Sequence, residues 1–260
     1  MSKKLLVVLL IGSLGANFFS LYILDKALFY RKHLSHIENT FPNRGARLAE
    51  VQDLTGPLPE KTGVFIGGSL VKFWFLPQDL PVLISNQGGL EEKISVDYQK
   101  MKSEITGSGA DYVFINSGFC EIHTAVNAEK DVDAVIDRNF EYLKKIVRSA
   151  QNDGIMPVLT TLTPVRKAFV FPYTKFLSIP SKKKQTENKA IKKYNRMIRQ
   201  YAEQKSLPLI DFEKACSNED GRLKKKYSVT DGEHLDLAGY QRLNRLLKER
   251  VSALADGREL

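Results

Sequence analysis

The chain has 260 residues, of which 43% are hydrophobic and 27% charged, so it is long enough for one α/β domain with a sizeable core. Its formal net charge of +9 favours anionic partners, although much of the excess lies in short lysine runs that are typical of a solvated surface. Two cysteines imply no disulfide framework, and the sequence shows no zinc-ligand spacing, Walker loop or nucleic-acid-reading motif. We therefore expect no metal, no cofactor and no nucleic-acid partner, and the sequence leaves the oligomeric state open.

Residues 1–30 contain an apolar run, Leu5–Leu24, that carries no charge. Its length of about 20 residues is what a helix needs to cross a bilayer core, so it predicts an N-terminal transmembrane helix. Two lysines before the run favour a short N-terminal arm inside and the rest of the chain outside the cytoplasm. The alternative is a signal peptide cut near Ala16, which would give a secreted protein.

Residues 31–61 have mixed polarity and several prolines and glycines, which is typical of a stalk or linker. The domain proper is expected over residues 62–260. There, strand-length apolar runs occur at Gly63–Ile66, Pro81–Ser85, Tyr112–Ser117, Met156–Thr161 and Leu207–Phe212. Apolar residues at helical spacing occur at Asp131–Asn152, Thr186–Lys205 and Leu237–Leu254. This alternation predicts a three-layer α/β/α sandwich with a mostly parallel sheet of about five strands, whose functional site lies beyond the carboxyl ends of the strands.

The first strand breaks at Gly67-Gly68 into a stretch that begins with Ser69 and can form a helix. Backbone N–H groups at such a helix start can stabilise an oxyanion, although serine is also a common N-cap. Far downstream, Asp231 and His234 are three residues apart, so one turn can aim both at a common point. Serine, histidine and an acid are the parts of an activated hydroxyl nucleophile. The alternative is that Asp231 and His234 merely cap the last helix.

These residues resemble motifs of the SGNH (GDSL) hydrolases. Gly67-Gly68-Ser69-Leu70 is similar to their GDSL block, with Gly68 where Asp is usual, and Asp231-x-x-His234-Leu235 is similar to their last block. The resemblance extends from about Gly63 to Val251 and implies the flavodoxin-like fold of that superfamily. It also implies that Ser69 is the nucleophile, that His234 is the base and that Asp231 orients the imidazole.

The resemblance places the oxyanion hole at Ser69, at a glycine of Asn86–Gly89 and at Cys120. It does not distinguish Gly88 from Gly89. Cys120 stands where the family has an asparagine, and a thiol is a poor hydrogen-bond donor. Because losing one oxyanion donor costs about 100- to 1000-fold in rate, we expect reduced activity unless another group replaces it.

Three alternatives follow from Cys120. Asn116, near the end of the same predicted strand, could reach into the oxyanion hole in its place. The fold could serve binding without turnover. Cys120 could itself be the nucleophile, with His123 three residues further on as its base.

The connection Thr163–Ser181 is long and rich in aromatic residues and proline. Long loops are usually functional or disordered, and the aromatic content argues against disorder. We interpret the segment as a wall or lid over the substrate, and its members Phe169, Phe171 and Tyr173 are the expected contacts. A small accessory packing cluster is the alternative.

Together these features predict a membrane-anchored serine ester hydrolase outside the cytoplasm. Its substrate would be an acyl ester of a glycan or a lipid, as for an O-acetyl esterase or a lysophospholipase. A close variant is acyl transfer, in which a sugar hydroxyl replaces water. The alternative from another class is a catalytically weakened domain that binds glycan or takes part in envelope assembly.

Overall fold

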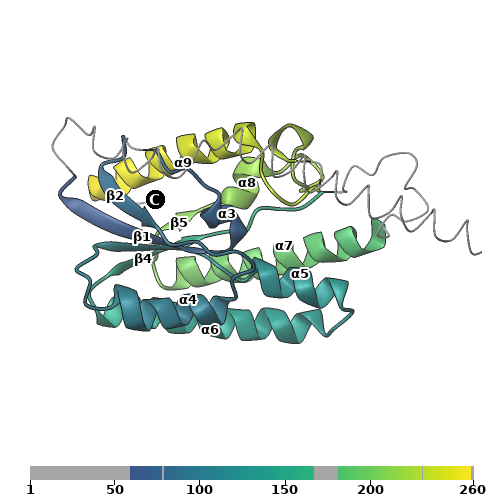
Figure 1. Cartoon of the computed structure of the whole chain (residues 1–260), viewed down its shortest axis with the longest axis horizontal. Coiled ribbons are helices and arrows are strands. Elements are labelled where there is room, and N and C mark those ends of the chain that lie inside the picture. The colour runs from purple at the N-terminus through teal and green to yellow at the C-terminus, as the bar shows by residue number, and fades with distance from the viewer. Residues whose placement is uncertain (1–58, 78, 167–180, 230, 259–260) are drawn as a thin grey trace, which may run out of the picture. The chain divides into compact units, whose positions relative to one another are not determined.

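The computed structural model describes residues 59–77, 79–166, 181–229 and 231–258 (Figure 1). Five strands form one sheet in the order β2-β1-β3-β4-β5, and all neighbouring strands are parallel. They are β1 (Lys61–Gly67), β2 (Val82–Asn86), β3 (Tyr112–Asn116), β4 (Met156–Thr160) and β5 (Leu209–Ile210). The predicted parallel sheet of about five strands is thus confirmed, although β5 has only two residues.

The three helices predicted from periodicity are α6 (Val132–Asn152), α7 (Ser181–Gln204) and α9 (Leu237–Ala255). The helix expected after Gly67-Gly68 is α3 (Ser69–Lys72). Shorter helices that the sequence analysis did not predict are α4 (Ile94–Lys100), α5 (Phe119–Asn127), α8 (Phe212–Cys216), the π-helical turn η1 (Met101–Ile105) and the 3₁₀ turn η3 (Lys225–Tyr227). The predicted anchor Leu5–Leu24 lies outside the described residues, as does most of the predicted linker. Among the helices that the structure does describe, none combines the length and the apolar character needed to cross a bilayer.

Side chains of the central strands alternate between two helical layers, as the period of a β-strand requires. Val64 and Ile66 of β1 belong to a buried core that residues of α4, α6 and α7 complete. Phe65, between them, points to the opposite face and contacts the rings of Trp74 and Phe212. Figure 1 shows α4 to α7 on one face of the sheet and α8 and α9 on the other. This is the predicted α/β/α sandwich.

The register of the sheet brings the carboxyl ends of three strands to one edge. Phe65 of β1 pairs with Asn86 of β2, and Gly67 pairs with Asn116 of β3. A side chain at Gly67 would not fit there, because its Cβ would lie 2.3 Å from the Asn116 carbonyl oxygen and its φ of 150° suits glycine. Ser69, the stretch after β2 and Cys120 therefore begin from the same edge, as the strand pattern predicted.

Asn195 of α7 clamps the chain where it leaves β4. Its side chain is fully buried, and it accepts a hydrogen bond from the Leu162 N–H and donates one to the Leu162 carbonyl, both at 2.8 Å. The same amide donates to Glu213 at 3.1 Å. Asn195 thus satisfies both backbone groups of a residue that has left the sheet.

We expect Asn195→Ala to lower the free energy of unfolding by about 2–4 kcal/mol, because it leaves buried backbone groups of Leu162 without partners. The matched control is Asn152→Ala, an exposed position at the end of α6, which should change it by less than about 0.5 kcal/mol. Urea denaturation followed by circular dichroism measures both. Equal effects of the two substitutions would show that the clamp does not stabilise the fold.

Candidate active site

Ser69, His234 and Asp231 form a hydrogen-bonded row. The Ser69 hydroxyl lies 3.1 Å from Nε2 of His234, and Nδ1 of the same ring lies 2.8 Å from Oδ2 of Asp231. Ser69 is the first residue of α3, and the N-cap is Gly68, so the N-cap interpretation of the serine is wrong. A hydroxyl, an imidazole and a carboxylate in this order can together generate a nucleophile at the serine.

Asp231 also shapes the loop that carries the imidazole. Its Oδ1 accepts hydrogen bonds from the backbone N–H groups of Glu233 and His234, at 2.8 and 3.0 Å. The alternative that Asp231 and His234 cap the last helix is wrong as well. The N-cap of α9 is Asp236, whose side chain accepts from the Gly239 N–H.

Partners from β2 and α9 hold the short α3 in place. The Asn86 amide donates to the carbonyls of Val71 and Trp74, at 2.7 and 2.9 Å. The Tyr240 hydroxyl of α9 donates to the Leu70 carbonyl at 3.1 Å. Since a four-residue helix has little stability of its own, these bonds fix the position of the serine.

Arg166 holds the loop with His234 from the side of β4. Its backbone N–H donates to the Gly232 carbonyl at 2.8 Å, and its Nη2 donates to the Val229 carbonyl at 2.8 Å. Its Nε also bonds the Ser228 hydroxyl. The sequence analysis did not single out Arg166, because its partners lie more than 60 residues further along the chain and no local pattern indicates them.

The two candidate oxyanion glycines are already engaged. The Gly88 N–H donates to the Asn86 side-chain oxygen at 3.0 Å, and the Gly89 N–H donates to the Gly67 carbonyl at 2.9 Å. Gly88 packs on the end of the serine helix, where a Cβ would lie 2.3 Å from the Lys72 nitrogen. Either N–H group would have to leave its present acceptor before it could donate to an oxyanion. The glycines instead allow close packing of the loop on α3.

Cys120 lies next to Gly68, the residue before the serine. It is the second residue of α5, and its Sγ is 3.3 Å from the position that a Cβ on Gly68 would occupy. Burial, followed by the charge of the adjacent Glu121, raises the pKa of the Cys120 thiol to about 12. The sulfur is thus protonated at neutral pH, which argues against its being the nucleophile.

Asn116 does not replace the missing donor. Its amide is buried and donates to the Thr160 hydroxyl at 2.7 Å and to the Thr161 carbonyl at 3.2 Å. Both bonds tie β3 to β4 beneath the site. The alternative that Asn116 reaches the oxyanion hole is therefore wrong.

Carboxyl groups surround the position of the missing donor. Asp97 of α4 is fully buried, and burial, with a smaller effect of Glu92, raises its pKa well above the usual range. Burial also raises the pKa of Glu121, whose Oε1 accepts the Ile94 N–H at 2.7 Å. Their charges, with that of Glu91, disfavour a thiolate at Cys120.

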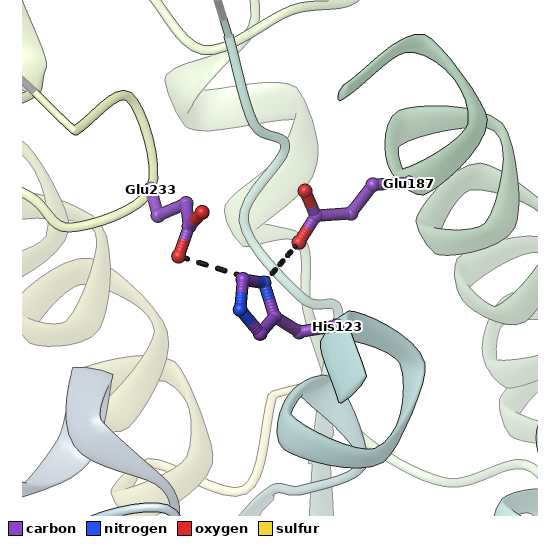
Figure 2. Close-up of side chains that lie close together, drawn as sticks. All are labelled: His123, Glu187 and Glu233. Carbon is purple, nitrogen blue, oxygen red and sulfur yellow. Dashed lines mark hydrogen bonds and ion pairs between the residues drawn. The ribbon is translucent and has the colours of Figure 1, made fainter. Parts of the chain in front are cut away.

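A second polar group lies next to the catalytic loop (Figure 2). His123 of α5 lies between two carboxylates, with its Nδ1 2.8 Å from Glu187 of α7 and 3.6 Å from Glu233. The three ligand-type atoms lie within 4.8 Å of one another, so among the described residues this group has the donors that a metal ion would use. The sequence analysis missed it, because the three residues are far apart in the chain.

The predicted substrate contacts Phe169, Phe171 and Tyr173 lie outside the described residues. The row of Ser69, His234 and Asp231 is therefore the part of the predicted site that the structure brings together.

The structure is similar to solved lipases and esterases. A GDSL-like lipase from Bacteroides thetaiotaomicron has a TM-score of 0.56 and 19% identity, and the alignment covers 82% of this chain and 98% of that one. An acetylxylan esterase from Geobacillus stearothermophilus has a TM-score of 0.57 and 14% identity, with 75% and 95% covered. At such identities the likeness establishes the fold. A comparison with curated proteins gives no match.

A family model adds the relationship in sequence. The model of the GDSL-like lipase/acylhydrolase family matches residues 87–242, which is more than half of the chain. The match begins after Ser69 and includes Asp231 and His234. The chain belongs to the GDSL-like lipase/acylhydrolase family.

Proposed function

We propose that this protein is a serine ester hydrolase with Ser69 as nucleophile. The observation that carries the proposal is the row from the Ser69 hydroxyl through His234 to Asp231, with contacts of 3.1 and 2.8 Å. Membership of an acylhydrolase family supports the same reaction class.

In the proposed reaction, the Ser69 oxygen attacks the carbonyl carbon of an ester while Nε2 of His234 takes its proton. The C–O bond to the alcohol then breaks, and the imidazolium returns the proton to the departing oxygen. Water repeats the sequence on the acyl-serine and releases the acid. Asp231, which accepts a hydrogen bond from the Nδ1–H group, keeps the ring in the required tautomer and stabilises its charged form.

Stabilisation of the oxyanion is the weak part of this site. The Ser69 N–H begins α3 and has no acceptor within that helix, so it can donate to the tetrahedral oxygen. The Gly88 and Gly89 N–H groups would first have to leave their present acceptors. Cys120 offers only a thiol. These features support a slow enzyme.

We propose an acylated glycan or lipid as substrate, outside the cytoplasm. The apolar run Leu5–Leu24 supports a membrane location, and the esterase among the structural neighbours acts on acetylxylan. Acyl transfer to a sugar hydroxyl uses the same acyl-serine and is the close variant. The aromatic residues of Thr163–Ser181 remain the proposed substrate contacts.

The second candidate function is a binding domain without turnover. The weak donor at Cys120 favours this candidate, because a tetrahedral oxyanion there would lack one hydrogen-bond donor. Labelling with a fluorophosphonate distinguishes the two functions, since only an activated serine reacts. Labelling at Ser69 would exclude the binding-only function.

We expect Ser69→Ala to abolish hydrolysis of p-nitrophenyl acetate, because the nucleophile is lost. His234→Ala should cost nearly as much, since the members of such a row act as a unit, and Asp231→Asn should cost less. Circular dichroism controls for folding. Wild-type activity in folded Ser69→Ala would refute the assignment.

Cys120→Asn should raise kcat about 10-fold, because an amide donates to the tetrahedral oxygen where a thiol barely does. KM should change little, since the bond strengthens in the transition state. Cys120→Ala is the matched control, which removes the thiol without adding a donor, and should not be faster than wild type. An unchanged kcat in folded Cys120→Asn would show that this position does not face the oxyanion.

The full-length protein should fractionate with membranes and resist extraction by carbonate or high salt, because a spanning helix is held by the hydrophobic effect. Salt would release a protein held only by exposed charges, which it screens. Truncation of residues 1–30 is the control and should give a salt-soluble protein. Recovery of a mature chain that begins near Ala16 would identify a signal peptide instead.

A further inference from the structure

The group of His123, Glu187 and Glu233 joins three parts of the chain that the catalytic row does not connect. His123 lies on α5, one helical turn after Cys120, and Glu187 lies near the start of α7 (Figure 2). Glu233 immediately precedes His234 in the loop. A link among them therefore ties the loop with the imidazole to the helices on one face of the sheet.

Contacts on its own helix fix the His123 ring. Its Nε2 lies 2.8 Å from the Asn127 side-chain nitrogen, one turn along α5. The Phe119 ring, one turn earlier, stacks on it with centroids 5.9 Å apart and planes 20° from parallel. The ring therefore presents Nδ1 to the carboxylates in a defined direction.

Glu187 provides the anchor of the group. It is 1% exposed and lies 2.8 Å from Nδ1 of His123. A carboxylate that is taken from water needs polar partners, so this contact is costly to lose. Glu233 lies 3.6 Å from the same nitrogen, beyond normal hydrogen-bond length but within the distance of an ion pair with a charged imidazolium.

Glu233 connects the group to the catalytic row. Its backbone N–H donates to Oδ1 of Asp231, the carboxylate that also receives Nδ1 of His234. A shift of Glu233 therefore moves the turn that aims the imidazole at Ser69. Arg166 holds the same loop through Gly232 from the other side.

We infer that His123, anchored by Glu187, is a positioning residue that holds Glu233 and so fixes the loop carrying Asp231 and His234. The proposed fixing of the loop follows from the contacts of His123, Glu187 and Glu233 and does not depend on any activity. Its catalytic consequence rests on the proposed ester hydrolysis.

The first test measures loop protection without any activity. Amide hydrogen exchange of the full-length protein should show about 10-fold faster exchange at Gly232, His234 and Asp236 in His123→Ala than in wild type. Lys193→Ala is the matched control, because it removes a 2.7 Å ion pair with Asp133 from the same α7 without touching the loop. Unchanged exchange in His123→Ala would overturn the inference.

The second test measures coupling in the rate of fluorophosphonate labelling at Ser69. His123→Ala and Glu233→Ala should each slow labelling about 10-fold, and the double variant should be no slower than either, because they break one link. For p-nitrophenyl acetate, the loss should appear in kcat rather than KM. Glu187→Gln, which keeps the size and an acceptor, should lose less than His123→Ala.

Independent effects that multiply to about 100-fold in the double variant would overturn the link. The link would also be overturned if His123→Ala and Glu233→Ala lowered the melting temperature but left the labelling rate of the folded protein at the wild-type value. Loss of loop protection on dialysis against EDTA would show that an ion joins the three side chains and would overturn direct bridging. If wild type does not label at all, the proposed function fails, and hydrogen exchange still decides the positioning role.

Discussion

The Asp231 carboxylate bonds three groups of its own loop, and the site depends on this. One oxygen accepts the N–H groups of Glu233 and His234, and the other faces Nδ1 of His234. The backbone turn and the direction of the imidazole are therefore set by a single side chain. Because residues 231–234 orient the His234 ring by themselves, the rest of the fold has only to bring the Ser69 hydroxyl to Nε2 of that ring. The sheet edge provides this, since β1 ends at Gly67, two residues before the serine.

The parts of the site that could be predicted are those encoded locally. The strand that breaks at two glycines and the three-residue spacing of Asp231 and His234 both appear in the sequence, and the structure joins them through one hydrogen bond. The strands and the long helices were predictable for the same reason, because their hydrophobic periods are local. β5 was predicted over Leu207–Phe212 but pairs over only two residues, since pairing depends on neighbouring chain.

What could not be predicted depends on contacts between distant residues. Nothing near Gly89 in the sequence shows that its N–H is taken by the Gly67 carbonyl, and nothing near Gly88 shows that it packs on α3. The same holds for the acidic surroundings of Cys120, to which α4 and α5 both contribute. Several carboxyl groups gather there within a chain of net charge +9, so overall charge is a poor guide to the residues around this site.

The asparagines of α7 have an evolutionary consequence. Asn195 holds Leu162, and Asn188 accepts the Val165 N–H at 3.1 Å, so the chain is pinned to α7 before it departs toward residues 167–180. The residues before and after the segment 167–180 are therefore both held by α7, whatever the length of that segment. Doubling the length of a flexible loop costs only about 0.6 kcal/mol in closure entropy. Insertions and deletions there can accumulate without disturbing the sheet, so relatives can differ in the length of this stretch and keep the same fold.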